Sequence, residues 1–219
     1  ESLCNLLAVD VVKVASPIYS GLCAHPTERV QQALRQEKEA KARGDTCDMP
    51  AFIVAVNIFL KGPPNYHLMF YFGVGDMSTI DGSNGTPSSK LANQFFFGNS
   101  DEFRDKTFKL IPRIVEGNFL VRKAVGSTPC IMGKAIKQTY AKGDRFFEVF
   151  LDTGSSAAAA GVIKLCSGYA KCISTDMAFL LEGTNESTLP ERLLGCARIK
   201  RLDFKKDVRF VKQPHECEV

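Results

Sequence analysis

Tryptophan is absent from this 219-residue sequence, histidine occurs only three times, and no apolar run is long enough to cross a bilayer. The longest apolar stretches, near residues 52–60 and 66–74, are far shorter than the roughly 20 residues that a membrane-spanning helix needs. His67 lies in one of them with no second metal ligand or base nearby in the sequence, so we interpret it as a structural residue. Sixteen phenylalanines without tryptophan indicate a sheet-rich interior filled by aromatic rings.

Motifs for metals and cofactors are also missing. The eight cysteines have neither the short paired spacings of zinc sites nor a recognisable disulfide framework, which favours a reducing, intracellular compartment. Gly73-Val74-Gly75 follows a strand, but neither a third glycine nor a helix comes after it, as a dinucleotide-binding fingerprint requires. The net charge is only +4 and no nucleic-acid-binding motif is present, which argues against nucleic acid as a partner. We therefore predict no metal and no cofactor.

The length and the hydrophobic fraction of 45% fit a single domain, 1–219, with a substantial core. We expect residues 1–50 to form a helical lead-in, 51–212 a core of sheet and helix, and 213–219 a tail. The first residue is Glu1 rather than Met, so we expect a fragment or a processed product whose targeting segment lies elsewhere. Both a cytoplasmic and an organellar location, peripheral to a membrane, stay open.

Hydrophobic periodicity predicts a strand–helix–strand–strand order in the second half of the chain. A helix nearly free of charge, 155–170, follows a strand at 147–151 and precedes strands at 172–182 and 193–202, and we expect it to be buried along most of its circumference. Upstream, the pattern predicts a charged helix from about residue 27 to Gly44, a central antiparallel hairpin at 51–60 and 66–72, and half-buried strands at 107–114 and 119–122. The predicted fold is α+β: a curved, mostly antiparallel sheet packed around one buried helix, with an N-terminal charged helix.

Asp152-Thr153-Gly154-Ser155, at the end of an apolar strand, has two interpretations. It matches the way aspartic proteases present a catalytic carboxylate, and Leu193-Leu194-Gly195 imitates the apolar element that supports such a site. That chemistry needs two aspartates sharing a proton, and only one such motif is present, so a homodimer would have to supply the second. Because an alanine-rich helix follows directly, the motif is more typical of a strand that ends in a turn and a capped helix. We predict that the protein is not an enzyme, and keep an aspartic-type hydrolase as a remote alternative.

A series of short motifs runs in a defined order along nearly the whole chain. The motifs are Leu7-Ala8-Val9-Asp10, Tyr66-His67-Leu68-Met69-Phe70-Tyr71-Phe72, Asp101-Glu102-Phe103-Arg104, Phe108-Lys109-Leu110-Ile111-Pro112, Val125-Gly126-Ser127-Thr128-Pro129-Cys130, Met132-Gly133-Lys134-Ala135, Asp152 to Ser156, Asp176-Met177-Ala178-Phe179-Leu180 and Leu189-Pro190-Glu191-Arg192-Leu193-Leu194-Gly195. This series resembles the enhanced-disease-resistance C-terminal domain, which often follows a START lipid-binding domain. In that family the turn is commonly Asp-Ile-Gly-Ser-Ser, so Thr153 alone creates the likeness to a protease.

The resemblance implies lipid association and signalling, with no catalytic residues to carry over. A curved sheet against a helix can enclose an apolar cavity, for which large side chains are the candidate lining: Phe70, Phe72, Phe147, Phe150 and Met177. An anionic headgroup or membrane surface would meet basic side chains, for which the candidates are Lys109, Arg113, Arg122, Lys123, Lys134, Arg198, Lys200, Arg201, Lys205 and Lys206.

The leading hypothesis is a non-enzymatic module that binds lipid or lies at a membrane surface. The alternative is a structural or interaction subunit of a larger, organellar membrane-associated assembly. The Phe95-Phe96-Phe97 cluster and the long charged helix favour this alternative.

Overall fold

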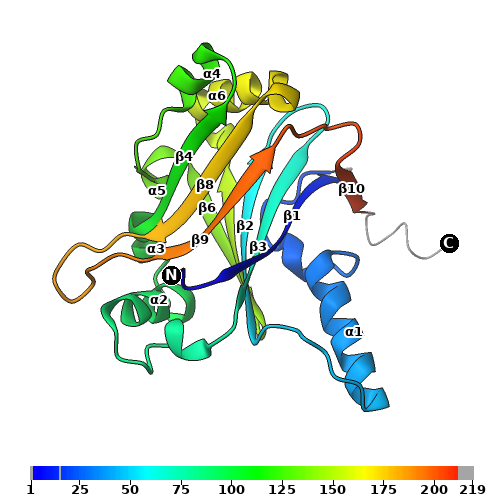
Figure 1. Ribbon diagram of the computed structural model, residues 1–219, viewed down its shortest axis with the longest axis vertical. Helices are drawn as coiled ribbons and strands as arrows, with labels where there is room; N and C mark the ends of the chain where they lie inside the picture. Colours follow the sequence, from blue (N-terminus) through cyan, green and yellow to red (C-terminus); the bar gives the residue numbers. More distant parts are fainter. Residues whose placement is uncertain (1, 15, 212–219) are drawn as a thin grey trace.

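The computed structural model describes residues 2–14 and 16–211 (Figure 1), so the proposed tail at 213–219 lies outside the described residues. Within this range the strands are β1 (Asn5–Val14), β2 (Phe52–Leu60), β3 (Tyr66–Val74), β4 (Phe108–Glu116), β5 (Cys130–Ile131), β6 (Lys137–Gly143), β7 (Phe146–Asp152), β8 (Ser174–Leu181), β9 (Leu193–Lys200) and β10 (Val208–Val211). The α-helices are α1 (Arg29–Arg43), α2 (Pro87–Phe97), α3 (Asp101–Thr107), α4 (Phe119–Val125), α5 (Met132–Ala135) and α6 (Ala157–Gly168). Short 3-10 turns are η1 (Leu22–Ala24), η2 (Met77–Thr79), η3 (Thr153–Ser155) and η4 (Ala170–Cys172).

The larger sheet is mixed and has the strand order β10-β1-β3-β2-β7-β6. Its centre is the predicted antiparallel hairpin of β2 and β3, and β7 joins β2 in parallel. Every residue of β2 is buried, because one face of the strand meets the second sheet and the other is covered by η1 and the start of α1. Cover on both faces accounts for the unbroken apolar run of this strand.

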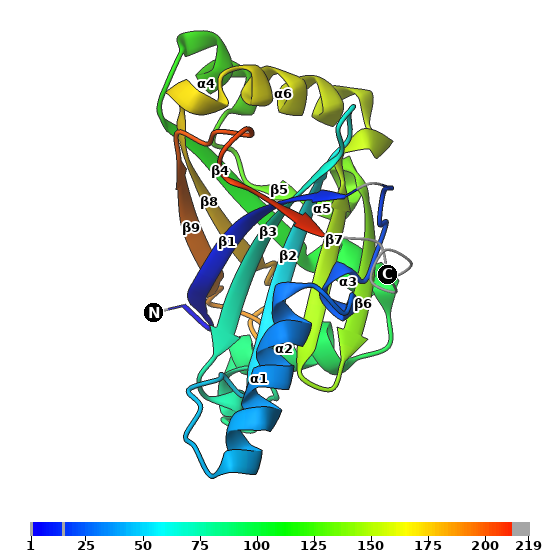
Figure 2. The ribbon, with the colours of Figure 1, turned by 90° about the vertical axis from the view of Figure 1, so that its right-hand side faces the viewer.

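The smaller sheet is antiparallel, with the order β5-β4-β8-β9, and it meets the larger one along one edge. There the backbone amides of Leu3 and Cys4 donate to the carbonyl oxygens of Leu193 and Leu194, at 2.8 and 2.9 Å. Gly195 lies against the ring of Phe72, where a Cβ atom would come within 2.5 Å of ring carbons. Figure 2 shows α6 lying across the opposite end, spanning from one sheet toward the other.

Aromatic rings fill the space where the sheets face each other closely. Phe179 of β8 meets Phe70 and Phe72 of β3 edge to face, with ring centroids 5.2 and 5.8 Å apart. Phe147 packs in the same way against Phe96 of α2, at 5.3 Å. Such edge-to-face geometry is the favoured arrangement of aromatic pairs and confirms the predicted aromatic interior.

The helix limits at α1 follow from its end residues, as the sequence predicts. The Glu28 carboxylate accepts a hydrogen bond from the Val30 amide at 2.8 Å, which caps the first turn. Gly44 ends the helix in the left-handed conformation, with φ of 79°, which glycine adopts without strain.

The α+β class is confirmed, but three details differ from the sequence-based expectation. The strands form two sheets rather than one. No residue of α6 is fully buried, because the helix crosses the end of the gap between the sheets instead of lying within a sheet's curve. Residues 119–125 form the helix α4 rather than a strand, since Asn118 accepts the Leu120 amide at 2.7 Å and caps a helical turn.

Candidate functional site

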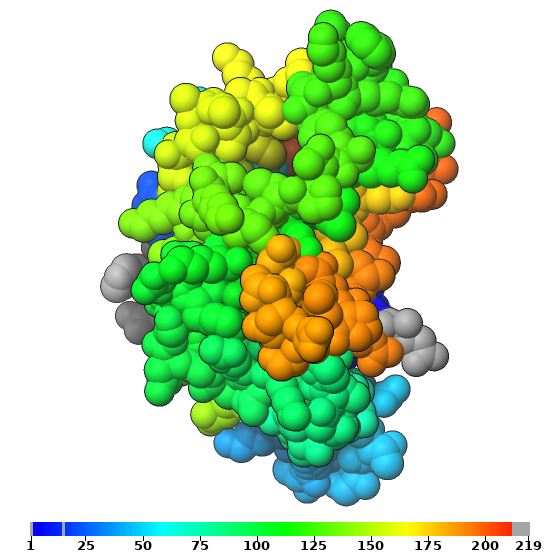
Figure 3. Space-filling model, turned by 90° about the vertical axis from the view of Figure 1, so that its left-hand side faces the viewer, coloured from blue at the N-terminus to red at the C-terminus, as the bar shows by residue number. Residues whose placement is uncertain are grey.

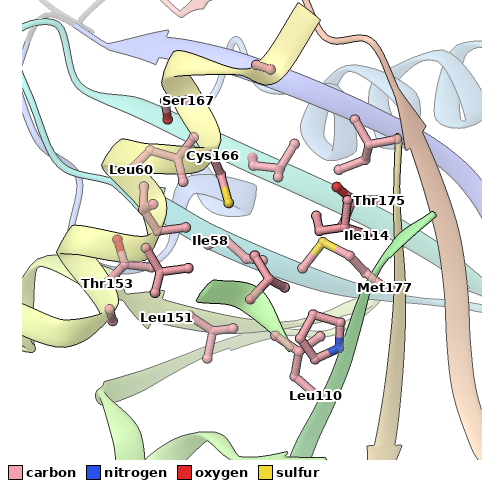
Figure 4. Close-up of a pocket in the computed structure, with 18 of the residues that line it drawn as sticks. Ile58, Leu60, Leu110, Ile114, Leu151, Thr153, Cys166, Ser167, Thr175 and Met177 are labelled. Atoms are coloured by element: carbon pink, nitrogen blue, oxygen red, sulfur yellow. The ribbon is translucent and has the colours of Figure 1, made fainter. Parts of the chain in front are cut away.

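An apolar cavity of about 310 Å³ lies between the two sheets, under α6. Figure 4 shows side chains converging on it from several elements: Ile58 and Leu60 of β2, Leu151 of β7, Leu110 and Ile114 of β4, Met177 of β8 and Cys166 of α6. A further set of lining residues comes from α4 and from the turn before β10, namely Ala124, Val125, Leu202 and Phe204. The cavity therefore occupies the end of the sheets at which α6 and α4 lie, beyond the packed aromatic core.

The cavity wall is uniform in chemistry. Among the described residues, no lining side chain is charged, and the only hydroxyl groups are those of Thr153, Ser167 and Thr175. The Thr153 hydroxyl already donates to the Phe59 carbonyl oxygen at 2.6 Å. Burial raises the pKa of the Cys166 thiol, which keeps this group neutral. The cavity thus favours an apolar occupant and offers few hydrogen bonds.

Helix α6 is the roof of this cavity, which explains its unusual exposure. Its sequence is apolar apart from Lys164, yet no residue in it is fully buried, because its outer positions are exposed and Val162, Ile163 and Cys166 border the cavity. Ser156 caps the first turn by accepting the Ala159 amide. An apolar helix face over a cavity is the arrangement from which an apolar ligand would gain the most contact.

Of the predicted lining residues, Met177 lines the cavity and the four phenylalanines do not. Phe70, Phe72 and Phe147 point to the same side of the large sheet as Leu68 and Leu151, but they lie further from α6, where the sheets close on each other. Phe150 points to the opposite face and packs against Phe59 at 5.9 Å, because side chains alternate along a strand. The true lining is mostly aliphatic, and no periodicity separates these positions from ordinary core.

The predicted basic residues divide into paired and free groups. Lys109 is buried and pairs with Glu182 and Glu191, so it cannot meet a headgroup. Arg198 pairs with Asp176, and Arg201 lies 3.6 Å from Glu116. The remaining candidates are exposed and make no ion pair among the described residues: Arg113, Arg122, Lys123, Lys134, Lys200, Lys205 and Lys206.

The Asp-Thr-Gly-Ser motif forms the turn η3 between β7 and α6. The Asp152 carboxylate accepts the Gly154 amide at 2.9 Å, and the Ser155 hydroxyl donates to the Asp152 carbonyl oxygen at 2.6 Å. Gly195 packs on Phe72 of β3, so the element that imitates a protease support is used where the two sheets meet. Each polar group of the motif thus has a local structural partner.

A buried polar network lies on the other face of the large sheet, and His67 is the member that its sequence had indicated as structural. Glu148 accepts hydrogen bonds from the Cys23 amide and the Asn57 side chain, both at 2.8 Å, and Asn57 in turn bonds His67 at 2.9 Å. Burial raises the pKa of Glu148 and lowers that of His67 to about 4. The Glu28 cap also accepts the Tyr71 hydroxyl. A lone glutamate within an apolar strand was the available signal for this network.

Membrane-spanning helices and metal sites are both missing from the described residues. None of the helices there has the length and apolar character needed to span a membrane. No grouping of histidine, cysteine and acidic side chains in that part of the chain could hold a metal ion, and its seven cysteines are all free.

Comparison with known proteins agrees with the order of motifs. The family described as Protein ENHANCED DISEASE RESISTANCE 2, C-terminal, matches residues 1–203. A protein described as "Protein ENHANCED DISEASE RESISTANCE 2-like" from Arabidopsis thaliana is 32% identical over 204 residues, which cover 93% of this chain and 25% of that protein. The chain thus spans about a quarter of this relative's length, and no solved structure matches it. On these grounds the chain belongs to the ENHANCED DISEASE RESISTANCE 2 C-terminal family.

Proposed function

We propose that this domain binds the apolar part of a lipid in the cavity under α6, without catalysing a reaction. The observation that carries the proposal is the uncharged, mostly aliphatic wall around about 310 Å³ of space. An apolar cavity of this size favours an apolar occupant, since the lining side chains would gain contacts with it.

The cavity volume restricts the class of lipid. Small-molecule sites span about 300–1,000 Å³, so this cavity lies at the lower end of that range. A single acyl chain, or an apolar molecule of similar size, matches it better than the two chains of a phospholipid. The charged or polar end of such a ligand would stay outside, because the wall has no charged side chain with which to pair it.

A role in binding rather than catalysis is supported by the local bonding of Asp152. Its carboxylate accepts a hydrogen bond from the Gly154 amide within the turn, and Asp152 does not line the cavity. An Asp152→Asn variant that binds ligand normally would agree with this role, whereas a hydrolytic activity abolished by that substitution would contradict it.

The direct test is uptake of a fluorescent fatty acid by the purified domain, compared between two alanine-to-phenylalanine variants in α6. Ala159 lines the cavity, whereas its neighbour Ala158 is exposed and does not. We expect Ala159→Phe to occupy cavity space and weaken uptake at least tenfold, and Ala158→Phe to bind as the unmodified domain does. Native mass spectrometry of the domain from its own source then identifies the bound molecule.

Equal uptake by both variants would show that the ligand does not enter the cavity. Absence of any bound lipid, together with stable association with other proteins, would favour the alternative of a structural subunit.

A further inference from the structure

The short helix α4 presents two large apolar side chains to solvent. Among the described residues, Phe119 and Leu120 are the most exposed large hydrophobic residues, at 72% and 59%. The helix cannot turn them inward, because Val121 is fully buried against Ile114 and Ile173 and holds the opposite side of α4 on the fold. Figure 3 shows the α4 region, in green, standing out at one end of the molecule beside α6, in yellow.

The surface around these two residues is cationic. Residues 117–129, which include α4, and 153–173, which include α6, contain four basic residues and no acidic one. The four are Arg122, Lys123, Lys164 and Lys171, and all are exposed. Asp203 pairs with Lys171 at 2.8 Å, and Glu116 accepts the Ser174 hydroxyl at 2.9 Å and lies beside Arg201. Arg122, Lys123 and Lys164 make no ion pair among the described residues, so they supply the net positive charge of this surface.

The same two helices enclose the cavity. Ala124 and Val125 of α4 and Val162, Ile163 and Cys166 of α6 all line it, and the two helices pack on each other through Val121 and Leu165. Figure 2 shows both at the same end of the molecule. Whatever contacts the exposed end of α4 therefore lies next to the roof of the cavity.

We propose that α4 docks onto an anionic membrane surface, with Phe119 and Leu120 entering the interface and the basic residues of α4 and α6 facing the headgroups. The proposal extends the proposed function, since it gives the source from which an acyl chain reaches the cavity. An exposed aromatic and aliphatic pair beside lysine and arginine is complementary to a lipid surface, whose interior is apolar and whose headgroups are negative. The apolar part alone would suit a protein partner as well, so the charge pattern decides for the membrane.

The test is co-sedimentation of the purified domain with vesicles of phosphatidylcholine, alone or mixed with phosphatidylserine. We expect binding to the mixed vesicles that weakens as salt is raised. The variant Phe119→Ser/Leu120→Ser should bind at least tenfold more weakly, while Phe210→Ser, which alters a 54% exposed phenylalanine on β10, should bind as the unmodified domain does.

A charge variant provides a second, independent comparison. Arg122→Gln/Lys123→Gln should weaken binding to the mixed vesicles, by roughly fivefold for each charge removed. Arg35→Gln/Lys38→Gln removes the same charge from the exposed face of α1 and should change binding far less.

Three outcomes would overturn the proposal: equal binding to both vesicle types, no binding to either, or unchanged binding by the Phe119→Ser/Leu120→Ser variant. Uptake of a fluorescent fatty acid in solution, without vesicles, separates this failure from failure of the proposed function. A domain that takes up the probe but does not bind vesicles would have the binding cavity and would lack the docking surface. Thermal unfolding of each variant shows whether it is folded.

Discussion

The imidazole of His67 is fully buried between an aromatic cluster and the polar network of the large sheet. Its Nδ1 lies 2.9 Å from the Asn57 side-chain oxygen, and the ring centroid lies 5.0 Å from that of Phe59. Its Nε2 has no hydrogen-bond partner among the described residues. Because the ring is buried and no carboxylate bonds it directly, the charged form is disfavoured and the pKa of His67 falls to about 4.

This lowered pKa predicts a loss of stability in mild acid. Between pH 6.5 and about 4 the unfolded chain binds a proton at His67 that the folded protein does not bind, so the free energy of unfolding falls as the pH falls. The total contribution is about 3 kcal/mol, fully present above pH 6.5 and lost by about pH 4. Denaturant unfolding across this range, compared with a His67→Gln variant, measures it.

His25→Gln is the comparison variant: burial lowers the pKa of the His25 ring as well, but this side chain is partly exposed, so its substitution should change the pH dependence less. A His67→Gln variant with the same pH dependence as the unmodified domain would contradict the assignment. So would an NMR titration in which the His67 ring protonates near its ordinary pKa.

At the scale of the elements, the first turn of α6 is capped by Ser156, but none of the residues of this helix is fully buried. The added Cβ of an alanine at Gly161 would meet nothing within 4 Å, because this position faces open space. Gly195 of β9 is the opposite case, since its missing side chain lets the two sheets meet over Phe72. The two glycines thus differ in what they contribute to their elements.

We predict that Gly161→Ala stabilises the domain by about 0.5–1 kcal/mol, the usual gain of alanine over glycine within a helix. Gly195→Ala should destabilise it by about 1–3 kcal/mol, because the new methyl group would force Phe72 or the strand to move. Urea unfolding of both variants measures the difference. Destabilisation by Gly161→Ala would mean that α6 is strained or packs more closely than its exposure indicates.

At the scale of the whole molecule, Asp10 connects parts that lie far apart in the sequence. Its carboxylate bonds Arg29 at the start of α1, at 2.7 Å, and Arg209 of β10, at 2.6 Å. Burial alone would raise the pKa of Asp10, but the hydrogen bonds from the two arginines outweigh it and lower the pKa. The strand β1, the charged helix α1 and the strand β10 are thereby held together at one edge of the large sheet (Figure 2).

We predict that Asp10→Asn lowers the free energy of unfolding by about 2 kcal/mol at neutral pH, because two charge-assisted hydrogen bonds are lost. Since the folded pKa is depressed, the contribution is complete above the unfolded value and is lost as the pH falls through the folded value. Asp45→Asn is the matched control, as its pair with Arg43 is exposed and should contribute little. Equal effects of the two substitutions in urea unfolding would contradict a special role for Asp10.

The sequence by itself determined most of the elements, because their signals are local. The β2–β3 hairpin follows from two apolar runs separated by Gly62, Pro63, Pro64 and Asn65, and the end of α1 follows from Gly44. The order β7, α6, β8, β9 and the family resemblance depend on the same short-range patterns. The prediction was wrong where a local pattern fits both a helix and a strand. At α4 the alternating apolar residues predicted a strand, and the segment is a helix.

Only the tertiary structure decided where the sheets separate, and hence which side chains line the cavity. Leu68 and Phe70 share one face of β3, yet one borders the cavity and the other is packed core, since that depends on how far each lies from the edge where the sheets join. The same holds for charge: Lys109 and Lys123 look alike in sequence, but the fold buries Lys109 and pairs it with two glutamates, whereas it leaves Lys123 exposed. Both outcomes depend on contacts between residues distant in the chain, which a periodic pattern does not encode.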